Sequence, residues 1–279
     1  MNIVNTVKEM QYITNEIRKN EKTISFLPTM GALHDAHLNL ISKAREISDT
    51  CVVSIFVNPT QFGPNEDFEK YTRDIEGDLI KLRDKDVDIA FVPELEEIYP
   101  KGFQTFVEVQ ELGNHLCGLF REGHFRGVAT IVLKLFNIVK PDIAIFGEKD
   151  YQQLKIIQRM VKDLNLEVEI LSFPIVRDKD GLALSSRNSY LSGQSKVSSC
   201  TVFRALTEIK RRFEEGSRDC KYMTDLGREI LREEKILDID YFEICDPETL
   251  ESRELAESGD LLAIAVRIGE TRLIDNMRL

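Results

Sequence analysis

The stretch TISFLPTMGALHDAH, residues Thr23–His37, has the pattern of a strand, a glycine turn and the start of a helix. Its first five residues favour a strand, and Pro28 and Gly31 then interrupt regular structure. From Leu38 onward apolar residues recur at spacings of three and four, as on the buried face of a helix. The pattern predicts a strand over Thr23–Leu27, a tight turn, and a helix that begins near two histidines.

These histidines, His34 and His37, are three positions apart in the first turn of the predicted helix and therefore project from one face. Backbone N–H groups there lack an intrahelical partner and favour an anion. A surface pair and a pair of metal ligands are the alternatives. The chain's other two histidines, His115 and His124, stand at no zinc-ligand spacing from cysteines or carboxylates. The stretch therefore favours a site for nucleotide phosphates.

The composition is that of a soluble globular protein with one or two domains: 279 residues, 42% hydrophobic and 30% charged. A formal net charge of −11 argues against nucleic acid or an acidic membrane surface as the main partner. No secretory signal is visible at the N-terminus, and the most apolar stretch, Val128–Val139, is too short to span a bilayer. We expect a cytoplasmic protein, in which the five scattered cysteines only pack.

Strands and helices alternate over the first two thirds of the chain. Helices are predicted from Val7, after His37, near Asp74 and up to Val139. This alternation predicts an α/β fold with a parallel sheet. The predicted strands are Thr23–Leu27, Cys51–Val57, Asp88–Val92, Gln104–Val109, Pro141–Phe146 and Glu167–Phe173.

The alternation ends after Leu191. We therefore place a boundary near residue 175, between a first domain of residues 1–175 and a smaller α+β domain of residues 176–279 whose position after a serine–arginine loop suits a lid. The predicted elements of this second domain are helices over Ser195–Glu215 and Met223–Glu234 and strands over Asp238–Ile244, Leu261–Val266 and Thr271–Ile274.

Polar residues follow the Cys51–Val57 strand, at the end where open α/β sheets bind ligands. Asn58 by itself is equally well explained as a cap. Gln61 offers an uncharged amide, which suits a substrate hydroxyl or carboxylate. In the helix that follows, Asp78 is a candidate magnesium contact.

A second strand, turn and helix start occurs at Gly147–Gln153. Gly147 permits close backbone approach, Lys149 supplies positive charge, and Asp150 can cap the helix or bind a ribose hydroxyl. Capping explains Asp150 but accounts for neither Lys149 nor Gln153.

Two loops carry arginine beside other polar groups. Ser185, Ser186 and Arg187 follow a glycine turn and offer a phosphate two hydroxyl donors and one forked cation. The segment Arg121–Arg126 is open to two interpretations, either anion handling or a solvated basic loop in which His124 caps a neighbour.

Six blocks of sequence, in order from near the first residue to the C-terminus, resemble the pantoate–β-alanine ligase family, also called pantothenate synthetases. One such block would be weak evidence, whereas six in the right order are specific. The blocks are Pro28–His37, Val57–Asp67, Gly123–Ala129, Phe146–Gln153, Gly181–Asn188 and Thr271–Asn276.

The resemblance implies a Rossmann-like nucleotidyltransferase domain, a C-terminal lid domain, a homodimer and magnesium-dependent use of ATP. It also implies two steps. The carboxylate of pantoate attacks the α-phosphate of ATP to give pantoyl adenylate and pyrophosphate, and β-alanine then displaces AMP to form pantothenate. Because negative charge develops on the phosphoryl oxygens, catalysis should be mainly positioning and electrostatic stabilisation.

The resemblance also assigns residues position by position. His37 stands where the family has a proton donor, and His34, Lys149 and Arg187 are the other expected catalytic residues. Gln61 and Gln153 resemble the pantoate contacts. The expected ATP contacts are Met30, Gly31, Ala32, Leu33, His34, Asp35, Ala36, His37, Gly147, Glu148, Lys149, Asp150, Val176, Leu184, Ser185, Ser186 and Arg187.

One residue departs from the family pattern. Ala36 replaces the glycine that usually precedes the second histidine, and its Cβ would point toward the bound nucleotide. Alanine favours the helix start, so the cost would fall on ATP binding. Ala36 is also compatible with a non-catalytic or weakened nucleotide-binding paralogue, and a nucleotidyltransferase of the same fold, which keeps the nucleotide on its product, is a further alternative. Gln61 with Gln153 favours the ligase over the transferase, and the retained Lys149 and Arg187 argue against the paralogue.

Overall fold

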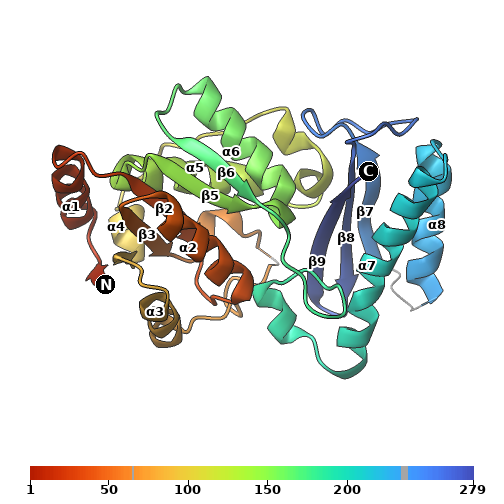
Figure 1. Cartoon of the computed structure of the whole chain (residues 1–279), viewed down its shortest axis with the longest axis horizontal. Coiled ribbons are helices and arrows are strands. Elements are labelled where there is room, and N and C mark those ends of the chain that lie inside the picture. Colours follow the sequence, from red (N-terminus) through yellow and green to blue (C-terminus); the bar gives the residue numbers. More distant parts are fainter. Residues whose placement is uncertain (65, 234–237) are drawn as a thin grey trace. The chain divides into compact units, whose positions relative to one another are not determined.

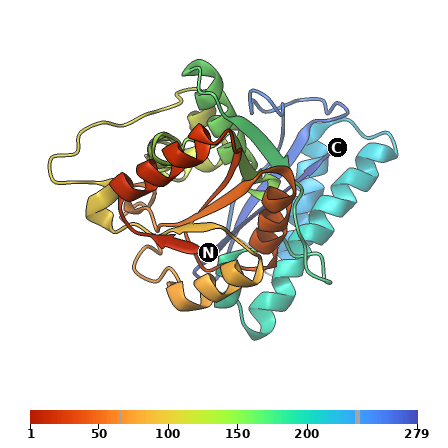
Figure 2. The same cartoon turned by 60° about the vertical axis from the view of Figure 1, so that its left-hand side comes forward.

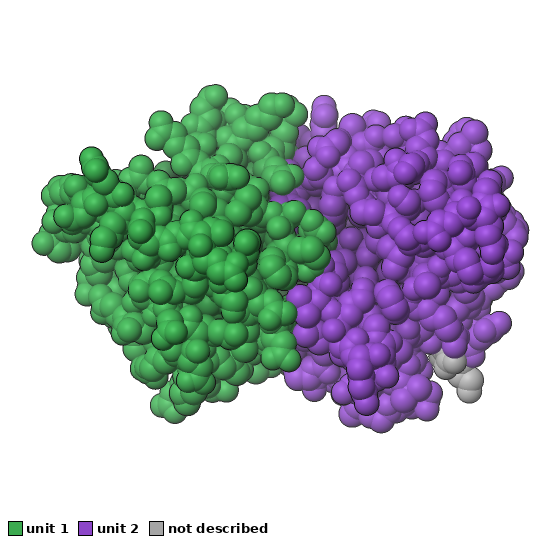
Figure 3. All heavy atoms as spheres, in the orientation of Figure 1, with its two compact units in different colours: residues 1–109, 121–148, 156–174 green, residues 110–120, 149–155, 175–279 purple. Residues whose placement is uncertain are grey.

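The computed structural model describes residues 1–64, 66–233 and 238–279. The chain forms two compact units, coloured separately in Figure 3. Unit 1 comprises Met1–Val109, Arg121–Glu148 and Ile156–Pro174, and unit 2 comprises Gln110–Phe120, Lys149–Lys155 and Ile175–Leu279. The predicted division into two functional domains at residue 175 stays a prediction.

Unit 1 is built on a six-stranded sheet in the order β1-β4-β3-β2-β5-β6, in which each pair of neighbouring strands is parallel (Figure 1). The predicted Rossmann-like α/β fold is confirmed. The strands β2 and β3 are almost wholly buried, as their continuous apolar sequences require of central parallel strands. The strands are β1 Asn2–Val4, β2 Ile24–Thr29, β3 Thr50–Ile55, β4 Ile89–Phe91, β5 Ile143–Gly147 and β6 Glu169–Phe173.

Helices cover both faces of this sheet. On one face, Ile41 of α2 and Leu82 of α3 belong to a single buried cluster with Val53 of β3. On the other, the ring of Phe136 from α5 contacts the ring of Phe26 from β2 edge to face. The α-helices of this part of the chain are α1 Val7–Lys19, α2 Asp35–Ile47, α3 Ile75–Asp84, α4 Leu95–Ile98, α5 His124–Val139 and α6 Tyr151–Asp163; 3-10 turns span Pro59–Gln61, Leu112–Asn114, Leu116–Leu119 and Glu148–Asp150.

Unit 2 contains an antiparallel sheet in the order β7-β8-β9, on which two helices pack. The predicted α+β architecture of the C-terminal region is confirmed. Its own core includes Leu206 of α7, Leu231 of α8 and Ile264 of β8. The elements are the 3-10 helix Ser186–Tyr190, α7 Gly193–Glu214, α8 Cys220–Glu233, β7 Asp238–Cys245, β8 Leu261–Ile268 and β9 Thr271–Arg278.

Two details differ from the sequence predictions, and two predicted residues are not described. Gln104–Val109 was predicted to be a strand, but it runs as irregular chain (Figure 2) and is tied to α5 by the Val107 N–H, which donates to Thr130 Oγ1 at 2.9 Å. The short strand β1 was missed because it has only three residues. Glu234, the predicted end of a helix, and Asn65 of the second family block lie outside the described residues.

The cysteines are free thiols, as predicted, and four of the five are buried. Burial raises the pKa of both Cys51 and Cys245 to about 12, so these thiols stay protonated and unreactive near neutral pH. Among the described residues, no helix is both long and apolar enough to cross a membrane.

The strand order of unit 1 predicts where a ligand would bind. Successive strands β2 and β3 lie side by side, whereas β5 pairs with the opposite edge of β2. The connections from β2 and from β5 therefore leave the sheet in opposite directions, which creates a switch point at the carboxyl ends of these two strands. The histidine stretch follows β2, and Gly147 ends β5.

Candidate functional site

A buried carboxylate holds the turn that follows β2. Asp78 of α3 accepts the N–H groups of Ala32 and Leu33, each at 2.8 Å. Lys81 lies one helical turn on, with Nζ 3.7 Å from the Asp78 carboxylate and 2.7 Å from the Leu33 carbonyl oxygen to which it donates. Burial raises the pKa of Asp78, whereas the two N–H groups and Lys81 act in the opposite direction. Both Asp78 oxygens thus bind backbone, and its contact with magnesium stays a prediction.

The backbone of this turn is left-handed at two consecutive residues, with φ of 80° at Gly31 and 51° at Ala32. A Cβ at position 31 would lie 2.9 Å from Asp78 Oδ2 and 3.0 Å from a methyl carbon of Ile55, so glycine is required there. The left-handed conformation costs an alanine about 1–2 kcal/mol. The charged hydrogen bonds to Asp78 offset this cost, so α3 stabilises a turn that the local sequence disfavours.

The two histidines meet where α2 begins. His37 lies in the first turn as predicted, but His34 is the N-cap, with extended backbone, and not part of the first turn. The ring centroids are 4.1 Å apart, and the His34 N–H donates to His37 Nδ1 at 3.4 Å. Because Nδ1 of the neutral His37 ring is the acceptor, we assign its proton to Nε2. His37 can therefore donate a hydrogen bond to a ligand through Nε2.

Gln61 is held in one orientation at the carboxyl end of β3. It ends the 3-10 turn Pro59–Gln61 and is 8% exposed. Its Oε1 accepts from Asn58 Nδ2 at 3.0 Å, and its Nε2 donates to Met30 Sδ at 3.2 Å. Asn58 is fixed in turn by the Tyr99 hydroxyl, which donates to Asn58 Oδ1 at 2.8 Å. Tertiary contacts thus join Gln61 to the histidine stretch through Met30.

A chain of charged and polar groups supports the Gln61 backbone. His124 Nδ1 donates to the Gln61 carbonyl oxygen at 2.8 Å, and Arg121 Nη1 donates to His124 Nε2 at 2.9 Å. This arrangement requires a neutral His124 with its proton on Nδ1, because arginine can only donate. Arg121 also makes two 2.6 Å hydrogen bonds to Glu66. His124 thus supports a neighbouring backbone, as one interpretation of Arg121–Arg126 predicted, but Arg121 is largely buried and not solvated, and a role in anion handling stays a prediction.

The segment after β5 supplies several predicted residues. Gly147 ends the strand, and Glu148–Asp150 forms a 3-10 turn that leads into α6. Glu148 Oε1 accepts from the hydroxyl of Ser172 on β6 at 2.7 Å. The Lys149 carbonyl oxygen accepts from Asn276 Nδ2 at 3.0 Å, while Gln153 on α6 is half-buried.

Gln152, which the sequence did not single out, is buried and organises the segment Gln110–Phe120. Its Oε1 accepts the Cys117 N–H at 3.0 Å, and its Nε2 donates to two carbonyl oxygens of that segment, those of Leu112 and His115. Adjacent glutamines therefore have different environments, since Gln152 binds backbone and Gln153 remains accessible.

The serine–arginine loop of unit 2 directly follows a hairpin. The Leu184 N–H donates to the Val176 carbonyl oxygen at 2.9 Å, so two predicted ATP contacts are paired across it. Ser185 caps the 3-10 helix that follows, where its Oγ accepts the Arg187 N–H at 3.3 Å.

The predicted site residues are divided between the two units. The structure brings the histidines, Met30 and Gln61 together within unit 1, and it joins Lys149 to β9 within unit 2. Unit 1 holds Met30–His37, Gln61, Asp78, Gly147 and Glu148, and unit 2 holds Lys149, Asp150, Gln153, Val176 and Leu184–Arg187. Across residues 1–64, 66–233 and 238–279, no group of three or more His, Cys, Asp or Glu side chains is arranged to hold a metal ion.

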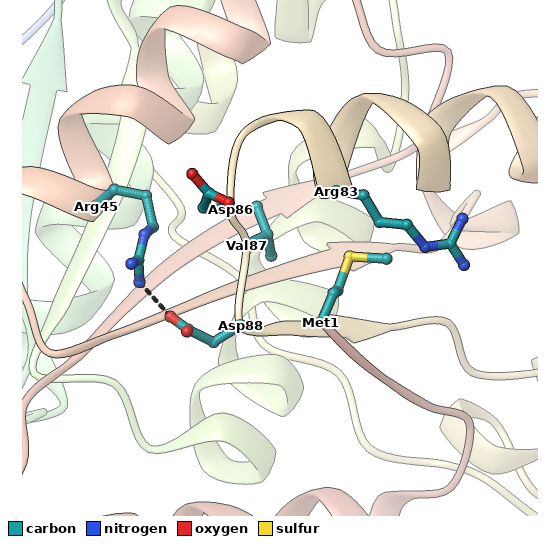
Figure 4. A pocket seen from close by; sticks show the side chains of 6 residues that line it. All are labelled: Met1, Arg45, Arg83, Asp86, Val87 and Asp88. Carbon is teal, nitrogen blue, oxygen red and sulfur yellow. Dashed lines mark hydrogen bonds and ion pairs between the residues drawn. The ribbon is translucent and has the colours of Figure 1, made fainter.

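A hollow of about 400 Å³ lies elsewhere on unit 1 (Figure 4). Met1 precedes β1 and Asp88 precedes β4, so the hollow lies at the amino ends of these parallel strands, away from the predicted site. Within it Asp88 forms an ion pair with Arg45 and accepts the Cys51 N–H at 2.8 Å, which gives this carboxylate a structural role.

We expect Asp78→Ala to lower the free energy of unfolding by about 2–4 kcal/mol, because it leaves two N–H groups of a strained turn without their charged acceptor. Urea unfolding measures this loss. Asp74→Ala is the control, since it removes the N-cap of the same helix and should cost only about 1 kcal/mol. Equal losses in the two variants would show that Asp78 does no more than support α3.

A second prediction concerns the Glu66–Arg121 pair. Burial acts to raise the pKa of Glu66, but the hydrogen bonds and charge of Arg121 outweigh it, so the pKa is lowered. A carboxyl group whose pKa is lower in the folded than in the unfolded protein stabilises the fold at pH values above its pKa in the unfolded protein, about 4.3. This stabilisation is lost as the pH falls through the pKa in the folded protein. The difference in unfolding free energy between wild type and Glu66→Gln should therefore be largest near neutral pH and shrink below about pH 4.

Urea unfolding at a series of pH values tests this, with Glu46→Gln as the control because Glu46 is exposed and its only described ion pair, with Lys43, is also exposed. A Glu66→Gln difference that stays constant with pH would contradict the prediction.

The comparisons with known proteins agree over almost the whole chain. The family model of pantoate–β-alanine ligase matches residues 2–278. A pantothenate synthetase of Thermosipho africanus is 50% identical over 277 residues, 99% of both chains.

Solved structures give the same result. The crystal structure of pantothenate synthetase from Thermus thermophilus is similar with a TM-score of 0.94 at 42% identity, covering 99% of each chain. A pantoate–β-alanine ligase from Francisella tularensis, complexed with β-γ ATP and β-alanine, has a TM-score of 0.83 at 35% identity and covers 100% of this chain and 97% of that one. Sequence and fold match along their full length, and this chain belongs to the pantoate–β-alanine ligase family.

Proposed function

We propose that this protein condenses pantoate with β-alanine at the expense of ATP, through a pantoyl adenylate, and releases pyrophosphate and AMP. Family membership over residues 2–278 carries the proposal. The related Francisella tularensis ligase, complexed with β-γ ATP and β-alanine, supports ATP and an amine as ligands.

The geometry of unit 1 supports the first step. His34 and His37 stand at the start of α2, where the N–H groups have no intrahelical partner and the helix dipole favours the phosphates of ATP. His37 Nε2–H would donate to oxygens on which negative charge develops as the carboxylate of pantoate attacks. Gln61, fixed by Asn58 and joined to Met30, offers pantoate an oriented neutral amide.

Residues of unit 2 complete the proposed set. Lys149 and Arg187 would neutralise the phosphates, Ser185 and Ser186 would donate to them, and Gln153 would bind pantoate. Positive groups and neutral donors stabilise a departing pyrophosphate without forming a covalent bond to the protein.

Magnesium is proposed to enter with ATP. Mg²⁺ in such sites typically keeps its waters and is bound by one or two carboxylates and the substrate phosphates. The described residues form no cluster of three or more metal-binding side chains, and both Asp78 oxygens bind backbone, which fits an ion held mainly by the phosphates. Bound there, it would screen phosphate charge. A homodimer, which rests on the family resemblance, and a location in the cytoplasm complete the proposal.

The defining assay measures AMP release by the purified protein with ATP and Mg²⁺. AMP should form at a high rate only when pantoate and β-alanine are both present, while pantoate alone should support exchange of labelled pyrophosphate into ATP. Hydrolysis of ATP without either substrate, or a product that retains the nucleotide, would contradict the proposal.

The departure at Ala36 gives a second test. We expect Ala36→Gly to lower the KM for ATP by up to about tenfold, or about 1.4 kcal/mol of binding, because it removes a Cβ near the nucleotide. The same change should cost about 1 kcal/mol of stability, since glycine is a poor helix former. Asn39→Gly, at an exposed position of the same helix, is the control and should lose stability without a change in KM. An unchanged KM in Ala36→Gly would show that Ala36 does not weaken ATP binding.

A further inference from the structure

The family block Thr271–Asn276 lies on β9 and contains no residue to which a role in the reaction was assigned. Two consecutive polar residues of this strand are nevertheless almost fully buried, Asp275 at 4% and Asn276 at 6% exposure. Consecutive residues of a strand point to opposite faces, so these two side chains reach different parts of unit 2. Buried polar groups persist only where they have partners.

Asp275 holds the base of the serine–arginine hairpin. Its carboxylate binds the Arg177 guanidinium at two points, with Nη1–Oδ2 at 2.6 Å and Nη2–Oδ1 at 2.8 Å. Burial raises the pKa of Asp275, and Arg177 acts against this and favours the ionised form. The two-point geometry fixes the direction of the guanidinium as well as its distance.

Arg177 also contacts the turn of the hairpin. Nη1 also donates to the Gly181 carbonyl oxygen at 3.0 Å, and the guanidinium lies over the Phe203 ring of α7, 4.3 Å from its centroid. A Cβ at Gly181, where φ is 89°, would lie 2.1 Å from that same ring. The segment that ends in Leu184–Arg187 is therefore fixed at its base by an ion pair and at its turn by close packing.

Asn276 holds the other phosphate-binding segment of unit 2. Its Nδ2 donates to the Lys149 carbonyl oxygen at 3.0 Å, across 127 positions of sequence. Its own N–H donates to Asp275 Oδ1 at 2.7 Å, and its carbonyl oxygen accepts from Arg177 Nη2 at 3.3 Å. Lys149 and the hairpin are thus attached to the same two residues of one strand.

We propose that Asp275 and Asn276 are positioning residues for adenylation, which set the spacing between Lys149 and the Ser185–Arg187 loop. The inference rests on the proposed function, because it assigns both segments to the phosphates of ATP. Neither residue needs to touch the substrate. Displacement of a reacting or charge-stabilising group by about 1 Å can lower the rate about a hundredfold. Loss of Asp275 or Asn276 should therefore slow adenylation in addition to lowering stability.

The test separates the two half-reactions. Asn276→Ala removes the hold on Lys149, and Asp275→Asn removes the charge opposite Arg177. In each variant the pantoate-dependent exchange of pyrophosphate into ATP should fall about tenfold to a hundredfold in kcat. The reaction of β-alanine with supplied pantoyl adenylate, in which no pyrophosphate leaves, should change less than about threefold.

Asp240→Asn is the matched control. Asp240 of β7 pairs with Arg272 of β9 at 2.7 Å, and the two side chains are buried to a degree similar to those of the Asp275–Arg177 pair. Asp240→Asn should lower the thermal unfolding midpoint about as much as Asp275→Asn does. The rates of both half-reactions should stay near those of the wild type. If Asp275→Asn does not fold, Arg177→Lys takes its place, because it keeps the charge and loses the two-point contact.

Three results would overturn the inference. The first is a wild-type rate of pyrophosphate exchange in Asn276→Ala. The second is an equal fall in the rates of both half-reactions that follows the loss of stability, because Asp275 and Asn276 would then have only a structural role. A wild-type protein that lacks pantoate-dependent exchange would overturn the proposed function itself and the inference with it.

Discussion

The constraint on which the rest of unit 1 depends is the left-handed turn between β2 and α2. The chain must leave a buried central strand and present a helix start at the carboxyl edge of the sheet, and it does so through two residues with positive φ. Asp78, from a helix more than forty positions away, accepts the N–H groups that this conformation exposes. Once the turn is fixed, the positions of Met30, His34 and His37 follow.

The same solution recurs for the other predicted site segments, since each is held by side chains from distant parts of the chain. His124 holds Gln61, while Asn276 holds Lys149. These supports are buried, so their hydrogen bonds and ion pairs have few competing partners in water and keep a defined geometry. A reaction that depends on positioning and electrostatic stabilisation requires such preorganised groups.

Much of the fold was predictable because parallel strands and amphipathic helices leave periodic patterns. The Cys51–Val57 and Pro141–Phe146 runs and the helix after Asp74 appear with ends shifted by two residues or less. The prediction of a strand over Gln104–Val109 was wrong, because alternating apolar residues do not by themselves provide a neighbouring strand to pair with. The Val107 N–H of this segment donates instead to Thr130 of α5. The boundary of the predicted domains remains a prediction.

The sequence by itself determined the fold class and the family, and it predicted the residue types of the site, since these depend on local periodicity and on short motifs. Only the tertiary structure decided which groups hold the site together. It paired Asp78 with a strained turn, made His124 a neutral support for Gln61, and joined Asp275 and Asn276 to the two segments of unit 2 that are proposed to bind phosphate. Such contacts join residues tens to more than a hundred positions apart, and hydrogen bonds of this kind leave no periodic signal in the chain.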